Sequence, residues 1–316
     1  MISIYNGGSV ATVTGFIESV SERKTKRNKS FVQFTLCKNG QSCSCFLWDS
    51  SLSKCKIEQN DVLEVKGQVK LYNGSKSLHV SGYKKVEPSE EIMDELMPHL
   101  PDEEIAAYKE EVNHLIADIN NKNYKKLLVC AFKKYGKEIF QAPAASKVHE
   151  AYRNGLIKHT INVTYNAIGL TKNYSTIIDK DLVVTASLLH DIGKIKSYIF
   201  NKFTIEYTKA GSLMDHIAMG SEIISNLCKE CDIKITDEEI MLLKHCILSH
   251  HGSVDKGWGS CVSPAIPEAI IIHAADMADT QMSIMTDEID KLNAGEKSDT
   301  KNYFLKSFVY KKLGSE

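Results

Sequence analysis

The sequence predicts a small five-stranded β-barrel followed by an all-helical domain. Short segments rich in β-branched and aromatic residues fill residues 10–86, and turn residues separate them. After residue 101 the pattern changes, because apolar residues then recur at spacings of three and four. The charge changes as well, since the first part is basic and the second part is acidic. These observations predict a multidomain protein of the β plus all-α class.

Five strands are expected, and turn residues such as those at 38–40 and 72–74 bound them. Within the second strand, Val32, Phe34 and Leu36 alternate as a core face and leave Phe31 and Gln33 on the other face. Five strands with little else between them are typical of a small barrel. The predicted strands span residues 11–20, 30–37, 42–48, 61–70 and 77–86.

The longest polar gap in this region, residues 21–29, joins the first two strands and is strongly basic. This arrangement resembles the OB-fold, in which that loop and the face of strands 2 and 3 bind single-stranded nucleic acid. Basic side chains contact phosphates there, and exposed aromatic side chains stack on bases of any identity. A solvated hairpin tip and aromatic core residues are the plainer alternatives. The candidate nucleic-acid-binding residues are Arg23, Lys24, Lys26, Arg27, Lys29, Phe31 and Trp48, with Phe46 and Tyr72 as further stacking candidates.

The two parts differ in charge. Residues 1–88 carry 13 lysines and arginines against 7 acidic residues, a net charge of +6, whereas residues 89–316 carry 26 against 33, a net charge of −7. A basic module favours a polyanionic partner, here single-stranded RNA or DNA, and an acidic remainder is compatible with a cation site.

The composition indicates a folded protein of the cytoplasm. A length of 316 residues with 43% hydrophobic content is enough for two domains. No apolar run approaches the roughly 20 residues of a membrane-spanning helix. The nine cysteines are odd in number and scattered, which does not match a secreted disulfide pattern. We therefore expect a cytoplasmic location, reduced thiols and no membrane partner.

Pro88 and the acidic residues beside it end the strand region, and helices are expected from there on. The expected helices cover residues 102–121, 124–140, 151–166, 180–189, 211–224, 236–250 and 267–279. Those at 102–121 and within 286–316 are candidate surfaces for a homo-oligomer. The predicted domains are residues 1–88, the barrel; 89–145, a linker and helical segment; 146–290, a helical metal-binding domain; and 291–316, a helical tail.

Several of these helices carry a histidine or an aspartate on their apolar side. The clearest case is the pair His190 and Asp191, which directly follows the apolar run 182–189. A single histidine at such a place is more often an ordinary core residue. An ionised carboxylate such as Asp276 in an apolar helix middle, however, is very unfavourable to bury without a partner. Imidazole and carboxylate ligands together suit one or more divalent ions. The set is His159, His190, Asp191, His216, His250, His251 and Asp276.

The order of these residues resembles the motif of the HD-domain metal-dependent phosphohydrolases, over residues 146–290. The resemblance implies that His159, His190, Asp191 and Asp276 hold one divalent ion. It further implies a second ion on His216 and His250, with Asp191 shared and His251 as an additional candidate. Lys194 would contact the phosphate, so Asp191 and Lys194 are the expected catalytic residues. The resemblance favours manganese, while the mixed ligands also allow iron, cobalt, nickel or zinc.

Two other histidines are weighed separately. His245 lies five residues before His250, on a different side of the helix, and is expected to be a packing residue. His273 lies one turn before Asp276 and is a candidate to orient that carboxylate.

A barrel in front of such a helical domain resembles the YhaM-type bacterial 3′→5′ exoribonucleases, as do the residues at 247–252, 259–260 and 267–269. The loop 258–264 matches only approximately. The resemblance implies hydrolysis of single-stranded RNA from the 3′ end, with single-stranded DNA as a second candidate substrate. The alternatives are a phosphodiesterase or phosphatase that acts on small nucleotides, and a protein that only binds single strands.

Overall fold

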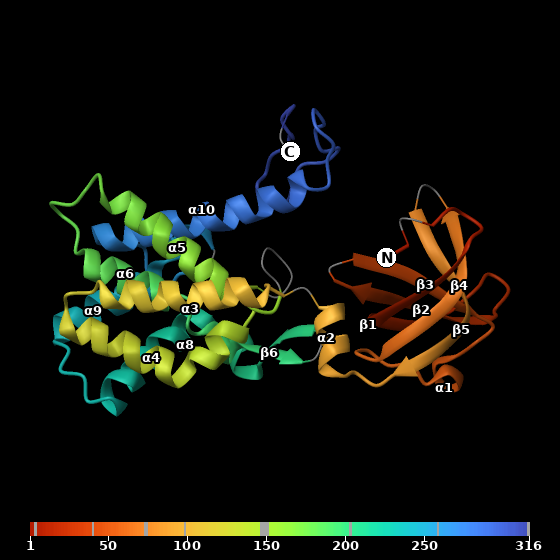
Figure 1. The fold of residues 1–316 in the computed structure, drawn as a ribbon, viewed down its shortest axis with the longest axis horizontal. Helices are drawn as coiled ribbons and strands as arrows, with labels where there is room; N and C mark the ends of the chain where they lie inside the picture. Colours follow the sequence, from red (N-terminus) through yellow and green to blue (C-terminus); the bar gives the residue numbers. More distant parts are fainter. Residues whose placement is uncertain are drawn as a thin grey trace. The chain divides into compact units, whose positions relative to one another are not determined.

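The computed structural model describes residues 1–316 except 3–4, 40, 73–74, 98, 146–151, 202–203, 258 and 315–316. It divides the chain into two compact units (Figure 1), one of Met1–His99 with Phe200–Thr204 and one of Leu100–Ile199 with Ile205–Glu316. The first division falls at 99/100 rather than at the predicted 88/89. The reason is helix α2 (Glu90–Leu96), because its Leu96 packs with Phe16 and Val62 of the barrel.

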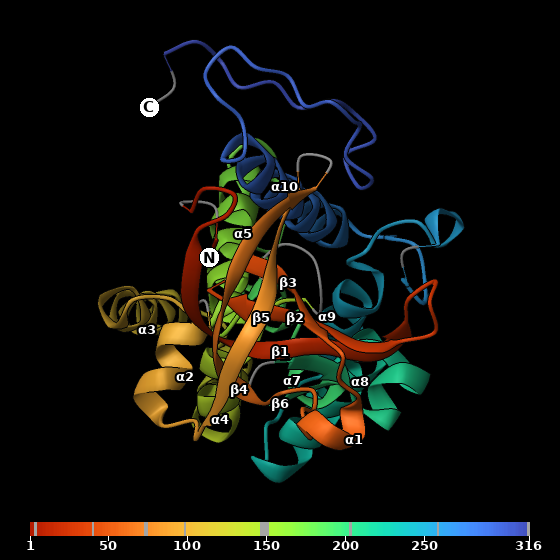
Figure 2. The same ribbon diagram turned by 90° about the vertical axis from the view of Figure 1, so that its right-hand side faces the viewer.

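The first unit contains a closed five-stranded barrel (Figure 2). The strand order is β1-β2-β3-β5-β4; β3 and β5 pair in parallel, and the other neighbouring strands pair antiparallel. This is the topology of an OB-fold and confirms the predicted fold class. The strands are β1 (Val10–Lys24), β2 (Ser30–Lys38), β3 (Gln41–Trp48), β4 (Val62–Tyr72) and β5 (Ser75–Val86), and a short helix α1 (Leu52–Cys55) precedes β4.

Alternation along β2 separates the inside of the barrel from the outside. Val32, Phe34 and Leu36 are buried, as predicted, and pack with residues such as Leu63 and Leu78. The neighbouring residues of β2 therefore lie on the outer face. That face is where the predicted stacking residues lie.

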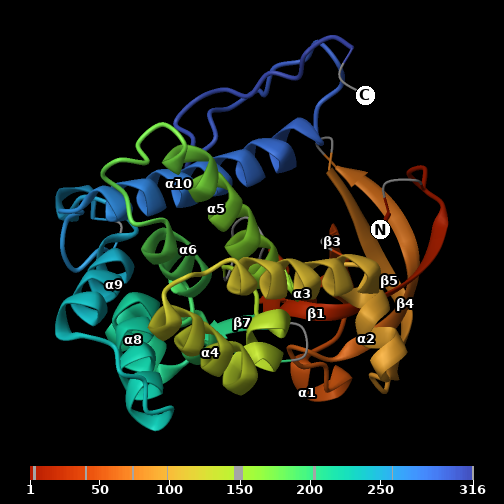
Figure 3. The ribbon, with the colours of Figure 1, turned by 60° about the vertical axis from the view of Figure 1, so that its left-hand side comes forward.

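The second unit is built mainly of helices around one core, which includes Leu127 of α4, Leu182 of α6 and Leu243 of α9. Helix α5 contacts both α6 and α10, and it runs beside α10 in Figure 3. None of the helices in the described part of the chain is long and apolar enough to cross a lipid bilayer. The helices are α3 (Asp102–Ala117), α4 (Lys122–Gln141), α5 (Gly155–Thr171), α6 (Lys180–Leu189), α7 (Lys194–Ser197), α8 (Lys209–Glu230), α9 (Asp237–Ser249), η1 (Val254–Lys256) and α10 (Pro267–Ile289).

Three features of the chain after residue 100 differ from the prediction. Helices α3 and α4 share the core of the following helices instead of forming a separate linker segment. A hairpin of two short strands, β6 (Tyr198–Asn201) and β7 (Thr204–Tyr207), interrupts the expected all-helical pattern. The predicted tail helix is absent from the described residues 291–314, which form turns and an isolated bridge between Lys297 and Tyr310. Gly295, at a φ of 81°, lies in one of these turns.

The cysteines also differ from the expectation of reduced thiols throughout. Cys130 of α4 and Cys231 after α8 form a disulfide across a sequence separation of 101 residues. The other seven cysteines are free, and six of these are buried. Two cysteines so far apart give no local signal, because only the packing of α4 against α8 brings them together.

Candidate metal centre and strand-binding face

Two helix ends deliver histidines in the same way. His190 follows α6 and His250 follows α9, and in each case the ring Nδ1 donates to a carbonyl oxygen three residues earlier, Ser187 O and Ile247 O, at 2.7 Å. A carbonyl oxygen can only accept a hydrogen bond, so the proton lies on Nδ1. Each Nε2 therefore presents a lone pair, which is the form of histidine that binds a metal.

Carboxylates orient the other two central histidines. His159 of α5 places Nδ1 at 2.7 Å from Asp279 Oδ2, and His216 of α8 places Nδ1 against Asp215 Oδ1. Each carboxylate accepts a hydrogen bond from Nδ1, as the backbone carbonyls do for His190 and His250. The Nε2 atoms of His159 and His216 therefore also point into the cluster. His216 also lowers the pKa of Asp215 to about 2, mainly through this hydrogen bond.

Asp191 lies at the centre and divides its two oxygens between two pairs of histidines. Its Oδ2 lies 3.4 Å from His159 Nε2 and 3.3 Å from His190 Nε2. Its Oδ1 lies 3.2 Å from His216 Nε2 and 3.6 Å from His250 Nε2. The Asp191 side chain is only 2% exposed. The structure thus brings together the predicted ligands from α5, α8 and the ends of α6 and α9.

Asp276 and Lys194 lie in the half of the cluster around Asp191 Oδ2, which also contains His159 and His190. Asp276 of α10 places Oδ1 at 3.3 Å from His159 Nε2, and the Lys194 ammonium lies 2.6 Å from Asp191 Oδ2. Lys194 is almost fully buried, with 10% of its side chain exposed. Its charge therefore acts at the centre of the site.

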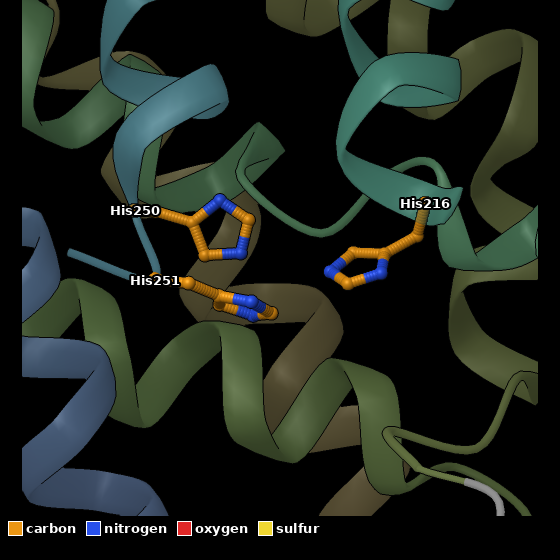
Figure 4. A group of neighbouring side chains, drawn as sticks. All are labelled: His216, His250 and His251. Carbon is orange, nitrogen blue, oxygen red and sulfur yellow. The ribbon is translucent and has the colours of Figure 1, made fainter. Parts of the chain in front are cut away.

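His251 lies beside the other half of the cluster, which contains Asp191 Oδ1, His216 and His250. In Figure 4 the rings of His250 and His251 face the ring of His216. The ring centroid of His251 lies 5.1 Å from that of His216 and 4.3 Å from that of His250. One ligand atom of each of the three residues lies within 4.8 Å of the others. Burial and the two neighbouring rings lower the pKa of His251 to about 3, which leaves it neutral and able to bind a cation.

The charges of the cluster are strongly coupled. Burial raises the pKa of Asp191, but the charge of Lys194, together with the neighbouring His190, outweighs burial and brings this pKa well below its usual value. The pKa of Asp276 is lowered for a similar reason, with His159 as its main partner. Burial lowers the pKa of His159, yet its carboxylate neighbours raise it well above the usual value. The site therefore holds two ionised carboxylates beside a histidine that readily takes a proton.

The donor set fits divalent ions. His159 Nε2 and His190 Nε2 face each other at 3.3 Å, an arrangement that needs a proton or a cation between the two lone pairs. On the other side, Asp191 Oδ1, His216 Nε2 and His250 Nε2 are buried and have no hydrogen-bond partner, because their short contacts lack hydrogen-bond geometry. Buried polar atoms without partners are rare, and mixed nitrogen and oxygen donors are the ligands of transition metals.

His245 and His273, the two histidines that were weighed separately, each make a hydrogen bond with a backbone atom. His245 Nε2 accepts a hydrogen bond from Ala265 N at 2.9 Å, which confirms a packing role. His273 Nδ1 donates to His250 O at 2.9 Å, and its role in orienting Asp276 stays a prediction. Gly252, at a φ of 89°, permits this contact, since a Cβ there would lie 2.5 Å from the His273 ring. His273 therefore supports the turn that carries His250.

The outer face of the barrel carries an aromatic cluster. Phe31 and Trp48 lie on neighbouring strands with ring centroids 4.7 Å apart, and Phe46 stacks on Trp48 at 5.8 Å. His79 of β5 joins them, because the Trp48 indole donates to His79 Nδ1 at 3.2 Å. Trp48 is 42% exposed and presents the most open ring of the cluster. The side chain of Tyr72 lies outside the described part.

The predicted basic residues lie beside this cluster. Strand β1 extends further than predicted and includes Arg23 and Lys24, and Arg23 pairs directly with Phe31 in the ladder. Lys26 and Arg27 are exposed in the following turn. Lys29 is exposed as well and pairs with Asp49 at 3.3 Å. Surface pairs of this kind are weak, so Lys29 can exchange its partner for a phosphate.

Comparison with known proteins agrees with this geometry. Residues 156–281 match the family model of the HD domain. The 3′-5′ exoribonuclease YhaM of Oceanobacillus iheyensis is 28% identical over 284 residues, which cover 89% of this chain and 87% of that protein. The 3′-5′ exoribonuclease YhaM of Bacillus subtilis is 28% identical over 284 residues, which cover 89% of this chain and 88% of that protein. The chain thus contains an HD domain and is similar to these exoribonucleases over most of its length. Among solved structures, PriB of Ralstonia solanacearum matches 24% of this chain and 97% of its own, with 17% identity and a TM-score of 0.22.

Sequence reasoning missed three residues of these sites. Asp279 lies three residues after Asp276 in α10, a spacing that places both carboxylates on one helix face, so it gave a usable signal. Asp215 directly precedes His216, which gave no periodic signal. His79 reaches the aromatic cluster of the barrel only through the parallel pairing of β5 with β3, so it gave no local signal.

Replacing Asp279 with alanine should weaken the binding of a divalent ion to the HD domain about 10- to 100-fold, because His159 then loses the group that orients it. Asp279→Asn should lose less, since its amide oxygen still accepts from Nδ1. Isothermal titration with Mn²⁺ measures the effect. Asp290→Ala, which removes an exposed carboxylate just after the same helix, is the control. Equal affinity in the Asp279 and Asp290 variants would contradict the role.

The affinity of the HD domain for Mn²⁺ should rise with pH. The pKa of His159 is raised, so a proton occupies this ligand below that pKa and must leave when the metal binds. Affinity should therefore increase as the pH rises through the raised pKa of His159, and it should level off above it. Titrations in buffers of different ionisation enthalpy should also detect proton release. A constant affinity without proton release would contradict this expectation.

Proposed function

We propose that this HD-domain hydrolase is a metal-dependent 3′→5′ exonuclease that hydrolyses the phosphodiester bonds of single-stranded RNA. The observation that carries the proposal is Asp191, whose two oxygens face two different pairs of histidines. A carboxylate placed in this way can serve two divalent ions at once. The RNA substrate and the direction rest on the relatives, which are named 3′-5′ exoribonucleases.

The first ion would be held by His159, His190, Asp191 and Asp276. The second would be held by His216, His250 and Asp191, with His251 beside them. We propose manganese for both. Bound ions of this kind activate water near neutral pH and neutralise charge on a phosphate.

The side chains of the chain supply the remainder of the mechanism. The hydrogen bonds on Nδ1 hold each imidazole in one tautomer and one orientation. Lys194 brings a positive charge to the same centre and would stabilise the phosphate as negative charge builds on its oxygens. The small accessible area of these residues excludes bulk water, which strengthens each of these interactions.

The barrel would hold the RNA strand. Trp48, Phe31 and Phe46 offer adjacent ring faces, and bases stack on such faces whatever their identity. Arg23 next to Phe31 supplies a charge for the phosphate of a stacked nucleotide. An enzyme that acts only on small nucleotides does not need such a surface, which favours a polymeric substrate.

The proposal is tested with 5′-labelled single-stranded RNA, in Mn²⁺ and in chelator. A ladder that shortens progressively from the 3′ end, only when metal is present, is the expected result. An intact strand together with hydrolysis of bis-p-nitrophenyl phosphate would overturn the exonuclease and favour the small-nucleotide enzyme. Single-stranded DNA of the same sequence, run in parallel, gives the preference between RNA and DNA.

Replacing Arg23, Lys24, Lys26, Arg27 and Lys29 together with glutamine should weaken RNA binding and flatten its salt dependence. The slope of log affinity against log salt should fall by roughly 0.7 for each phosphate contact that is lost. Hydrolysis of bis-p-nitrophenyl phosphate should be unchanged. The control replaces Lys54, Lys56, Lys66 and Lys84, which are exposed outside this loop. An unchanged slope in the loop variant would place strand binding elsewhere.

A further inference from the structure

Asp215 has a backbone conformation that side chains rarely adopt. Its φ of 61° and ψ of 157° interrupt α8, so that one helical segment ends before it and another begins at His216. This region of backbone space is used almost entirely by glycine, because a Cβ is strained there. Such strain persists only where the surrounding structure or the function maintains it.

The backbone turn determines where His216 lies. It starts the second helical segment with His216, which places the Nε2 of that residue 3.2 Å from Asp191 Oδ1. A glycine at position 215 would allow the same turn without strain. The turn by itself therefore does not explain the aspartate.

The Asp215 carboxylate makes two contacts with His216 that a glycine could not make. Asp215 Oδ1 accepts a hydrogen bond from His216 N at 2.5 Å and lies against the Nδ1 of the same residue. The first bond satisfies the first N–H of the new helical segment, and the second determines which ring nitrogen carries the proton. His190 and His250 obtain the same effect from backbone carbonyls. His216 opens a helical segment instead of ending one, so no carbonyl of a preceding turn is available to it.

We propose that Asp215 is a positioning residue for the second divalent ion, and that its strained backbone is kept because its carboxylate orients His216. The inference rests on the two-metal site of the proposed function. It does not rest on the RNA substrate or on the direction of hydrolysis.

The test compares Asp215→Gly with Asp215→Ala in the full chain. The glycine variant relieves the strain and loses the carboxylate, whereas the alanine variant loses the carboxylate and keeps the strain. In chelator, Asp215→Gly should melt about 2–4 °C above the unsubstituted protein, and Asp215→Ala should show no gain. In Mn²⁺ titrations, both should bind the second ion about 10- to 100-fold more weakly and the first ion as before.

A glycine variant that binds both Mn²⁺ ions as tightly as the unsubstituted protein would overturn the proposal. An Asp215→Asn variant adds a check, because its amide oxygen can still accept from Nδ1 and it should recover part of the affinity. If the unsubstituted protein binds only one Mn²⁺, the two-metal site and this role of Asp215 are both wrong. If it binds two with the expected variant effects but leaves RNA intact, the exonuclease proposal alone fails.

Discussion

Asp191→Asn should abolish the metal-dependent hydrolysis of RNA, with a loss of more than about a thousandfold. The expected loss exceeds the 10- to 100-fold that is typical when a group only orients a ligand. Asp191 supplies one oxygen to each half of the site. Asparagine has a single oxygen and no charge, and its NH₂ would face one pair of histidines. Rates on labelled RNA and Mn²⁺ titrations should both show the loss.

The control for Asp191→Asn is strand binding. The barrel has its own core, so the variant should still bind single-stranded RNA with an unchanged salt dependence. Far-ultraviolet circular dichroism confirms that the helices remain. A variant that keeps activity within about tenfold of the unsubstituted protein would contradict the central role of Asp191. Strand binding by an unsubstituted protein that lacks any metal-dependent turnover would instead support the binding-only alternative.

Gly193→Ala should destabilise the HD domain by about 3 kcal/mol and lower its melting temperature by roughly 6–12 °C. A Cβ at Gly193 would lie 1.8 Å from His216 O and 2.7 Å from Gly220 N. Both are backbone atoms, which cannot rotate away as a side chain can. The turn after Asp191 must therefore separate from α8, and His216 moves away from Asp191. Thermal melting and hydrolysis should both be impaired.

Gly220→Ala is the matched control, because it adds a Cβ on the other side of the same contact. That Cβ would meet Gly193 N at 3.5 Å and Ile247 Cγ2 at 3.6 Å, which are ordinary distances. Alanine also favours the helix by up to about 1 kcal/mol over glycine. The control should melt at or above the temperature of the unsubstituted protein. Equal behaviour of the two variants would show that close approach at Gly193 is not needed.

Local patterns predicted most of the fold. The alternation in β2 and the turn residues between the strands identified a five-stranded barrel, and each strand lies within a few residues of its prediction. Local patterns did not predict the features that depend on packing between residues far apart in the sequence. The disulfide between Cys130 and Cys231 and the inclusion of α2 with the barrel both depend on contacts far apart in sequence. The tail after Ile289 was expected to be helical, but its described part forms turns, with Gly295 at a positive φ, and one isolated bridge.

The candidate ligands of the site could be predicted from the sequence, but most of the groups that orient them could not. A single histidine on an apolar helix face is more often a core residue, so His159, His190 and Asp276 could be recognised only together, as members of one set. Most of the partners on Nδ1 have no such signature. Ser187 O and Ile247 O are backbone atoms, and Asp215 gave no periodic signal, whereas the spacing of Asp279 from Asp276 could have indicated it.

The sequence by itself determined the fold class, the order of the ligands and the basic character of the barrel, because periodicity, residue type and charge are local properties. Only the tertiary structure decided how Asp191 divides its oxygens between two pairs of histidines, and which group orients each imidazole. It also decided that His79 joins Trp48, and that Asp215 adopts a backbone conformation normally left to glycine. These arrangements depend on distances between separate helices and strands, which no local pattern contains.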